Sequence, residues 1–143
     1  MAAVRALGKL SRQRPEVVEH IRSAWKDRHP EVRATVLQVA ATLEIRVPTG
    51  FLEEAIEDED KVVRIAALKL AATQGVYAPL HTIARALQDE DWLVRRNAAE
   101  SLARLGDRQV VGALVPLLED ENDMVRETVE GALASLGWTP PRE

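Results

Sequence analysis

Residues 89–106 read Asp89-Glu-Asp-Trp-Leu-Val-Arg-Arg-Asn-Ala-Ala-Glu-Ser-Leu-Ala-Arg-Leu-Gly106, and the chain repeats this stretch in register. A Val-Arg pair recurs every 31 residues, and an aspartate precedes each arginine by six residues. The pairs are Val32-Arg33, Val63-Arg64, Val94-Arg95 and Val125-Arg126, preceded by Asp27, Asp58, Asp89 and Asp120. A repeat of this length predicts a solenoid, in which similar units stack in a row.

Each repeat divides into two helical patterns separated by turn signals. In residues 89–106, Asp91 suits a helix N-cap because its carboxylate can accept hydrogen bonds from backbone N–H groups. Apolar residues then recur at three- and four-residue spacing, the pattern of one helix face. These residues are Val94, Ala98, Leu102 and Leu105. Gly106 suits the left-handed position that ends a helix.

The other copies carry the same signals at equivalent positions. Asp60 and Asn122 are predicted N-caps, Pro30 suits a first helical turn, and Gly75 and Gly137 share the repeat position of Gly106. Each first helix is expected to bury two apolar residues, and Pro116 is expected to kink the helix at about 109–119. The buried pairs are Ile21 and Trp25, Leu52 and Ile56, Ile83 and Leu87, and Leu114 and Leu118.

The repeats predict one domain over residues 1–143. Its parts are the second helix of a partial repeat at 1–12, helix pairs at about 15–45, 48–74, 78–105 and 108–137, and a tail at 138–143. A chain that opens in the middle of a repeat is expected either as a fragment of a longer array or with an end that a partner covers. End-to-end association of two copies is a further expectation.

The pattern Asp-Glu-Asp-x-x-Val-Arg-x-x-Ala-Ala-x-x-Leu-Ala-x-Leu-Gly of residues 89–106 resembles the HEAT repeat, and most closely the 31-residue HEAT-like form of phycocyanobilin lyases. The resemblance implies an all-α fold: a right-handed, armadillo-like superhelix of antiparallel helix pairs, with the second helices on the concave face. It also implies a ladder of charge-assisted hydrogen bonds within and between repeats, formed by the four aspartates and four arginines listed above. An aspartate at a helix start can accept backbone N–H groups and an arginine together.

Composition limits the kinds of function. The chain has no cysteine, which excludes disulfides and thiolate chemistry. Its first ten residues are too short and too charged to suit a secretory signal, and no apolar run reaches membrane length, so we expect a cytoplasmic protein. Residues 1–33 carry eight Lys/Arg against four Asp/Glu, whereas residues 34–143 carry 11 against 19. A chain that is acidic over most of its length is a poor general binder of nucleic acid.

The best candidate site is an apolar strip on the second helices. The position before each repeated valine holds Glu31, Val62, Leu93 and Met124, so three consecutive repeats place an apolar side chain where solvent is expected. With Ile65 and Trp92, the residues Val62, Leu93 and Met124 form what we call the apolar strip. Its predicted polar rim consists of Arg96, Asn97, Lys69, Glu100 and Arg104, and Arg96 is the rim residue expected to contact the partner. Alternatively, Val62 and Leu93 belong to the core, since a small helix rotation decides between the two positions.

Two charged segments are weaker candidates. The acidic turns at 57–60, 89–91 and 119–123 would attract a basic partner or divalent cations, or they simply cap helices. The basic segment would contact phosphate, or it is a solvated face. It comprises Arg5, Lys9, Arg12, Arg14, Arg22, Lys26 and Arg28.

No catalytic constellation is recognisable in the sequence. His20, His29 and His81 fall on different repeats without metal-binding spacing, and the glycines do not form a phosphate loop. We therefore predict a noncatalytic scaffold, without a cofactor or a metal, that binds a protein or peptide on its concave face. The alternatives are a subunit of a phycobilin lyase-like enzyme and a weak nucleic-acid-binding module that uses the basic segment.

Overall fold

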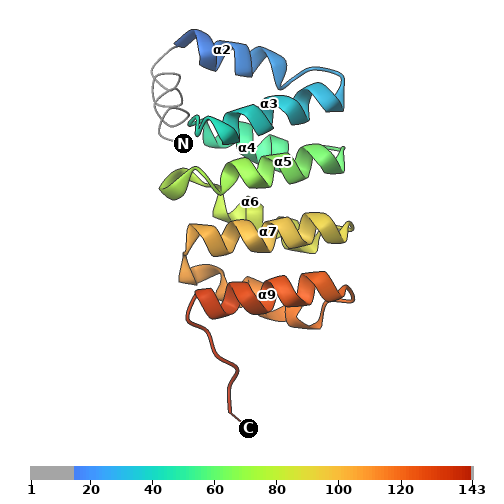
Figure 1. The fold of residues 1–143 in the computed structure, drawn as a ribbon, viewed down its shortest axis with the longest axis vertical. Coiled ribbons are helices and arrows are strands. Elements are labelled where there is room, and N and C mark those ends of the chain that lie inside the picture. Colours follow the sequence, from blue (N-terminus) through green and yellow to red (C-terminus); the bar gives the residue numbers. More distant parts are fainter. Residues whose placement is uncertain (1–14, 143) are drawn as a thin grey trace. The chain divides into compact units, whose positions relative to one another are not determined.

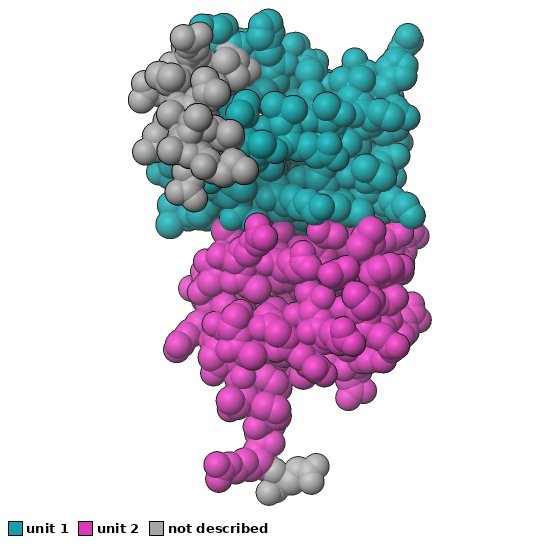
Figure 2. Space-filling view, in the orientation of Figure 1, with its two compact units in different colours: residues 1–78 teal, residues 79–143 magenta. Residues whose placement is uncertain are grey.

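The computed structural model describes residues 15–142, and every regular element in that range is a helix (Figure 1). The chain divides into two compact units, residues 1–78 and residues 79–143 (Figure 2). The partial repeat predicted at 1–12 lies outside the described residues. The helical class follows from the apolar spacing of three and four residues, which gives each helix one face to bury.

The first unit contains two pairs of helices. They are α2 (Pro15–Ala24) with α3 (Pro30–Thr42), and α4 (Thr49–Ile56) with α5 (Lys61–Ala71), followed by a single 3-10 turn, η1 (Gly75–Tyr77). Helices α3 and α5 pack side by side, and α4 packs against α5 (Figure 1). Leu37, Leu52, Leu68 and Leu70 are almost completely removed from solvent in this core.

The second unit uses shorter first helices. Its elements are α6 (Leu80–Arg85), η2 (Ala86–Gln88), α7 (Trp92–Leu105), η3 (Arg108–Val110), α8 (Val111–Leu114), η4 (Val115–Glu119) and α9 (Asp123–Ser135). Helices α7 and α9 pack side by side, as α3 and α5 do in the first unit. The single helix predicted at about 109–119 is instead broken into η3, α8 and η4. Pro116 explains the end of α8, because proline has no N–H to continue the α-helical ladder.

The predicted N-caps are confirmed. The carboxylate of Asp60 accepts from the N–H groups of Val62 and Val63, and that of Asp91 accepts from Leu93. The side-chain oxygen of Asn122 accepts from Met124 and Val125 in the same way. Pro30 is the first residue of α3. These caps define the starts of the second helices because each satisfies backbone donors that have no partner within the helix.

The left-handed stop is confirmed at Gly106 and Gly137, where φ is 70° and 81°. Gly75 also has a positive φ, but the prediction that it closes the preceding helix is wrong: α5 ends at Ala71 and Gly75 begins η1. Helix α3 closes instead through Glu44, whose φ is 53°. A glutamate therefore occupies the repeat position that holds glycine in the three later copies.

The first described repeat is less completely buried than the sequence pattern predicts. Ile21 and Trp25 are only half-buried, whereas Leu52 and Ile56 at the equivalent positions are buried. Val32 is 38% exposed, although the equivalent Val63 is 1% exposed. Val63 lies on α5, which packs against α3, while no described second helix precedes α3. Val63 is thus buried on the helix that packs against α3.

Candidate functional site

The predicted Asp and Arg positions meet between successive repeats of the first unit. Arg33 donates from Nε and Nη2 to the two carboxylate oxygens of Asp58, at 3.0 Å each. Its Nη1 donates to the main-chain oxygen of Asp27 at 2.7 Å. Asp58 in turn accepts the N–H of Asp60 at 2.9 Å. One guanidinium thus joins the turn of its own repeat to the turn of the next, in the two-pronged geometry that planar Arg and carboxylate groups favour.

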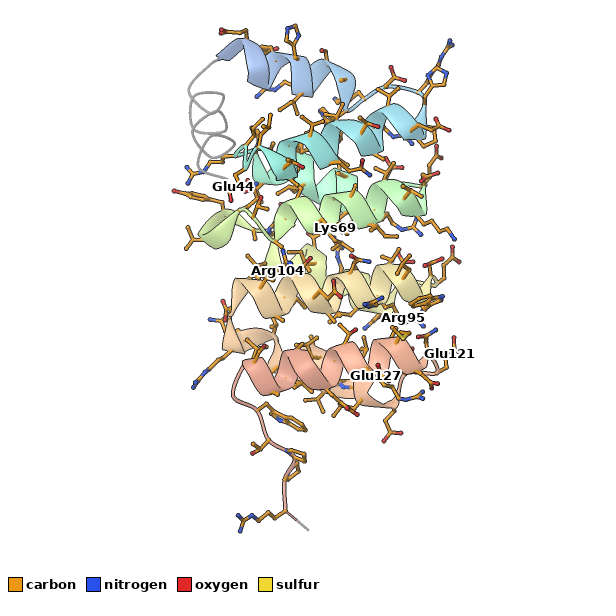
Figure 3. All side chains as sticks on the ribbon, in the orientation of Figure 1. Glu44, Lys69, Arg95, Arg104, Glu121 and Glu127 are labelled. Atoms are coloured by element: carbon orange, nitrogen blue, oxygen red, sulfur yellow. The ribbon has the colours of Figure 1, made fainter. Side chains whose placement is uncertain are left out.

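The second unit repeats this arrangement. Arg95 donates to both oxygens of Asp120 at 2.9 and 3.0 Å, and its Nη1 donates to the main-chain oxygen of Asp89 at 2.8 Å. The side chains of Arg95 and Asp120 are each 9% exposed. Glu121 lies 3.9 Å from the same guanidinium, at one end of α7 and α9 (Figure 3). Because these groups are shielded and already paired, their geometry is that of a structural joint.

The remaining members of this set also contact their own turns. Arg64 donates to the main-chain oxygens of Asp58 and Glu59. Arg126 donates to the main-chain oxygen of Asp120 and pairs with the Asp123 carboxylate. Each repeated arginine therefore donates to the main-chain oxygen of the aspartate six residues before it. These arginines are Arg33, Arg64, Arg95 and Arg126.

Hydrogen bonding shifts the pKa of four charged groups. Side-chain hydrogen bonds to Asp58 and Asp120 raise the pKa of Arg33 and Arg95 above the usual value. Burial acts to raise the pKa of Asp120, but hydrogen bonds from Arg95 and from the Asn122 N–H outweigh it, and the pKa is lowered. Backbone and side-chain hydrogen bonds from His29 lower the pKa of Asp27. These two arginines and two aspartates stay charged at neutral pH, so none of the four is poised to exchange a proton in catalysis.

The acidic turns have a structural use at several positions. Asp58, Asp89 and Asp120 each accept the N–H two residues ahead, and Asp60 and Asp91 cap helices. Within residues 15–142, no group of three or more His, Asp or Glu side chains is arranged to hold a metal ion. These five aspartates therefore have a structural role in turns and helix caps.

The apolar strip is partly exposed on the second unit. Trp92 is 38% exposed and Met124 is 41% exposed, while Leu93 is half-buried. Leu93 and Met124 occupy equivalent repeat positions on α7 and α9, which pack against each other. Large apolar side chains left open to solvent on neighbouring helices are typical of an interaction surface.

On the first unit, α5 carries the rest of the strip. Val62 is 50% exposed, and Ile65 is half-buried one turn away. Both lie in the first half of α5, so the pattern of α7 recurs on this helix. The alternative that Val62 belongs to the core does not hold, because half of its surface is accessible.

The predicted polar rim divides into exposed and buried residues. Lys69, Glu100 and Arg104 are exposed, and half-buried Arg96 lies 3.4 Å from the Glu100 carboxylate. Asn97 is wrong as a rim residue: it is buried, and its amide donates to the main-chain oxygen of Leu93 at 2.8 Å. Since Asn97 follows Arg96 by one residue, it points about 100° away around the helix.

The basic segment is described only in part. Arg5, Lys9, Arg12 and Arg14 lie outside the described residues. Arg22 is exposed and lies 3.6 Å from Glu19, and Arg28 and Lys26 are exposed. His29 contacts Asp27, and His20 and His81 are exposed on other helices. The described cations of this segment thus lie on and just after α2, not along a continuous groove of second helices.

The structure also contains a feature that the sequence reasoning missed. A groove of about 240 Å³ lies between α2, residues 45–48 and α4. Ile21 and Trp25 line it, and their partial burial is the outcome that the periodicity did not predict. No helix in residues 15–142 has the length and apolar character that crossing a bilayer requires.

Comparison with known families identifies the repeats. The family model for HEAT repeats matches residues 48–134, which is more than half of the chain. A search of curated proteins gave no significant match. The relation to the phycocyanobilin lyase form in particular rests on the sequence pattern alone. The matched region contains the Arg95–Asp120 joint and the capped second helices α5, α7 and α9. The chain belongs to the HEAT repeat family.

Proposed function

We propose that the protein is a noncatalytic scaffold that binds a protein or peptide through the apolar strip. The observation that carries the proposal is the exposure of Trp92 and Met124, on helices whose other faces are packed. HEAT repeats commonly act as protein-interaction scaffolds, which agrees with this use of the surface. Tryptophan and methionine are enriched at interfaces because each buries a large apolar area and few polar groups.

The binding mechanism follows from the rigidity of the supporting helices. Trp92 and Leu93 are the first two residues of α7, directly after the Asp91 cap. Met124 is the second residue of α9, whose N-cap is Asn122. The caps fix the backbone from which the anchors project, so that association orders few additional groups. Arg96 and Glu100 supply polar contacts beside the anchors.

The test is affinity capture from a lysate of the source cells with the full chain. The wild type is compared with a Trp92→Ala/Met124→Lys variant, in which only exposed positions are changed so that the fold is retained. Val76→Lys is the matched control, because Val76 is an exposed apolar residue outside the strip. Circular dichroism checks that all three proteins are equally helical.

A partner captured by the wild type and by Val76→Lys, but not by the strip variant, supports the proposal. Subsequent titration with Trp92→Ala alone is expected to weaken binding at least tenfold, the loss typical of an interface anchor. Equal capture by all three proteins contradicts the proposal and moves the binding surface away from the apolar strip.

A further inference from the structure

The groove between α2 and α4 is the strongest unassigned feature of the first unit. Its floor and walls are apolar, and they come from three segments of the chain: α2, the α3–α4 connection and α4. The apolar lining consists of Ile21, Trp25, Ile45, Val47, Pro48 and Phe51. The groove lies outside the apolar strip, so a test of one surface is independent of the other.

The groove exists because the first helices do not pack as closely as the second helices. Helices α3 and α5 are in extensive contact, whereas α2 meets α4 mainly through an aromatic pair. The rings of Trp25 and Phe51 are 4.2 Å apart at their centroids and tilted by 59°. An open apolar space lies beside this pair and is lined by the buried residues Ile45 and Val47.

The rim of the groove carries an excess of positive charge. Arg22, Lys26 and Arg46 line it, against the single carboxylate of Glu54. The Arg46 guanidinium lies 3.7 Å from the centroid of the Tyr77 ring, which restricts its position. The Lys26 ammonium lies 5.5 Å from the centroid of the Trp25 ring, directly beside the apolar lining. A bound molecule would therefore meet apolar walls first and cations at the opening. An apolar body with an anionic end fits both the apolar walls and the positively charged rim of this groove.

We propose that the groove binds a small apolar carboxylate. The groove volume of 240 Å³ far exceeds the space that one water molecule needs, so the groove can admit a short hydrocarbon chain or one aromatic ring. Octanoate is a simple carboxylate with such a chain. The carboxylate lies at the opening between Lys26 and Arg46, and the hydrocarbon lies against Trp25 and Phe51.

The test uses three ligands of equal length: octanoate, octanol and octylammonium. Each is titrated into the full chain labelled with ¹⁵N, and backbone amide shifts give both the affinity and the location. Octanoate is expected to shift the amides of Arg46, Val47 and Phe51 and to bind roughly fivefold more tightly than octanol, with octylammonium weakest. Failure of octanoate to shift these amides, or equal binding of the three ligands, overturns the proposal.

Variants then separate charge recognition from apolar binding. Lys26→Gln/Arg46→Gln is expected to lower the affinity for octanoate to that for octanol. Lys26→Glu/Arg46→Glu is expected to make the affinity for octylammonium the highest of the three. Lys69→Glu/Arg142→Glu makes the same change in net charge at exposed positions that do not line the groove, and this variant is expected to keep the preference. An equal effect of both Glu double variants overturns the proposal, because the preference would then reflect net charge alone.

Discussion

At the scale of single residues, the repeat positions explain both the regular and the exceptional side chains. Asp58 and Asp120 each accept two kinds of hydrogen bond. One comes from the N–H two residues ahead in their own turn, and the other comes from the arginine of the preceding repeat. Glu44 is the exception, because it takes a left-handed conformation in the column that otherwise holds glycine. Two main-chain hydrogen bonds hold it there, from Ile45 N–H to Ala40 and from Glu44 N–H to Ala41. Such closure is the usual glycine-based helix ending, made here without glycine.

Replacing Glu44 by glycine is expected to stabilise the protein. A left-handed conformation costs a residue with a Cβ about 1 kcal/mol, and glycine removes this cost. Urea unfolding followed by circular dichroism measures the change in the free energy of unfolding. Glu44→Ala is the control, since alanine keeps the strained conformation while it removes the contacts of the glutamate side chain. If Glu44→Gly is no more stable than Glu44→Ala, backbone strain at this position is not significant.

The Arg95–Asp120 pair predicts a specific response to acid. The lowered pKa of Asp120 means that its stabilising contribution is complete above the ordinary carboxyl value of 3.8 and is lost as pH falls through the lowered value. Asp120→Asn is therefore expected to cost about 3 kcal/mol at pH 7, because it leaves a shielded guanidinium without its carboxylate. The difference from the wild type should shrink below about pH 4.

The measurement for this pair is the free energy of unfolding in urea at intervals from pH 7 to pH 2. Asp123→Asn is the matched control, because Asp123 pairs with Arg126 but its side chain is largely exposed. Exposed pairs contribute about 0–1 kcal/mol. A difference between the wild type and Asp120→Asn that stays constant down to pH 2 would contradict the assignment.

At the scale of elements, a buried side chain holds the connection between α3 and α4. Gln74, just after α5, is buried and reaches back to the α3–α4 connection. Its Oε1 accepts the N–H of Val47 at 3.0 Å, and its Nε2 donates to the main-chain oxygen of Ile45 at 3.1 Å. The side-chain amide thus satisfies two backbone groups in the connection, after α3 has ended and before α4 begins.

Gln74→Met is expected to reduce the free energy of unfolding by about 2 kcal/mol or more, because a side chain of similar length leaves a buried donor and acceptor unsatisfied. Gln38→Met is the control, since Gln38 is exposed on α3 and surface substitutions usually change stability by less than about 0.5 kcal/mol. Urea unfolding measures both variants. Equal stability of the two would show that water replaces the lost bonds at no cost. Hydrogen exchange at the Val47 amide should rise in Gln74→Met alone.

At the scale of the whole molecule, the predictable part of the structure is the part encoded by spacing. Caps such as Asp91 and stops such as Gly106 act locally, so their positions follow from sequence. The spacing of Asp58 and Asp120 also allowed their pairing with arginine to be anticipated through the family resemblance. The half-burial of Trp25 could not be predicted in this way, because it depends on how far apart two first helices lie.

The same reasoning applies to the candidate surfaces. A helix rotation of one position separates exposed Val62 from buried Val63, which periodicity alone does not resolve. Asn97 was misplaced for this reason. Glu44 could have been found, since it precedes Gly75 by one repeat length. The groove has no sequence signature, because its lining comes from three segments whose residues are individually typical of a core.

The Arg33–Asp58 and Arg95–Asp120 joints have a consequence for how such a chain can change in length. In each joint the donor belongs to one repeat and the acceptor to the next, so the contact is heterologous and has a direction. If a 31-residue repeat were duplicated in register, the aspartate of the inserted copy would pair with the arginine of the preceding repeat. The arginine of the inserted copy would pair with the aspartate of the following repeat. Within either unit, a whole repeat can therefore be gained by tandem duplication while each of these arginines and aspartates keeps a partner.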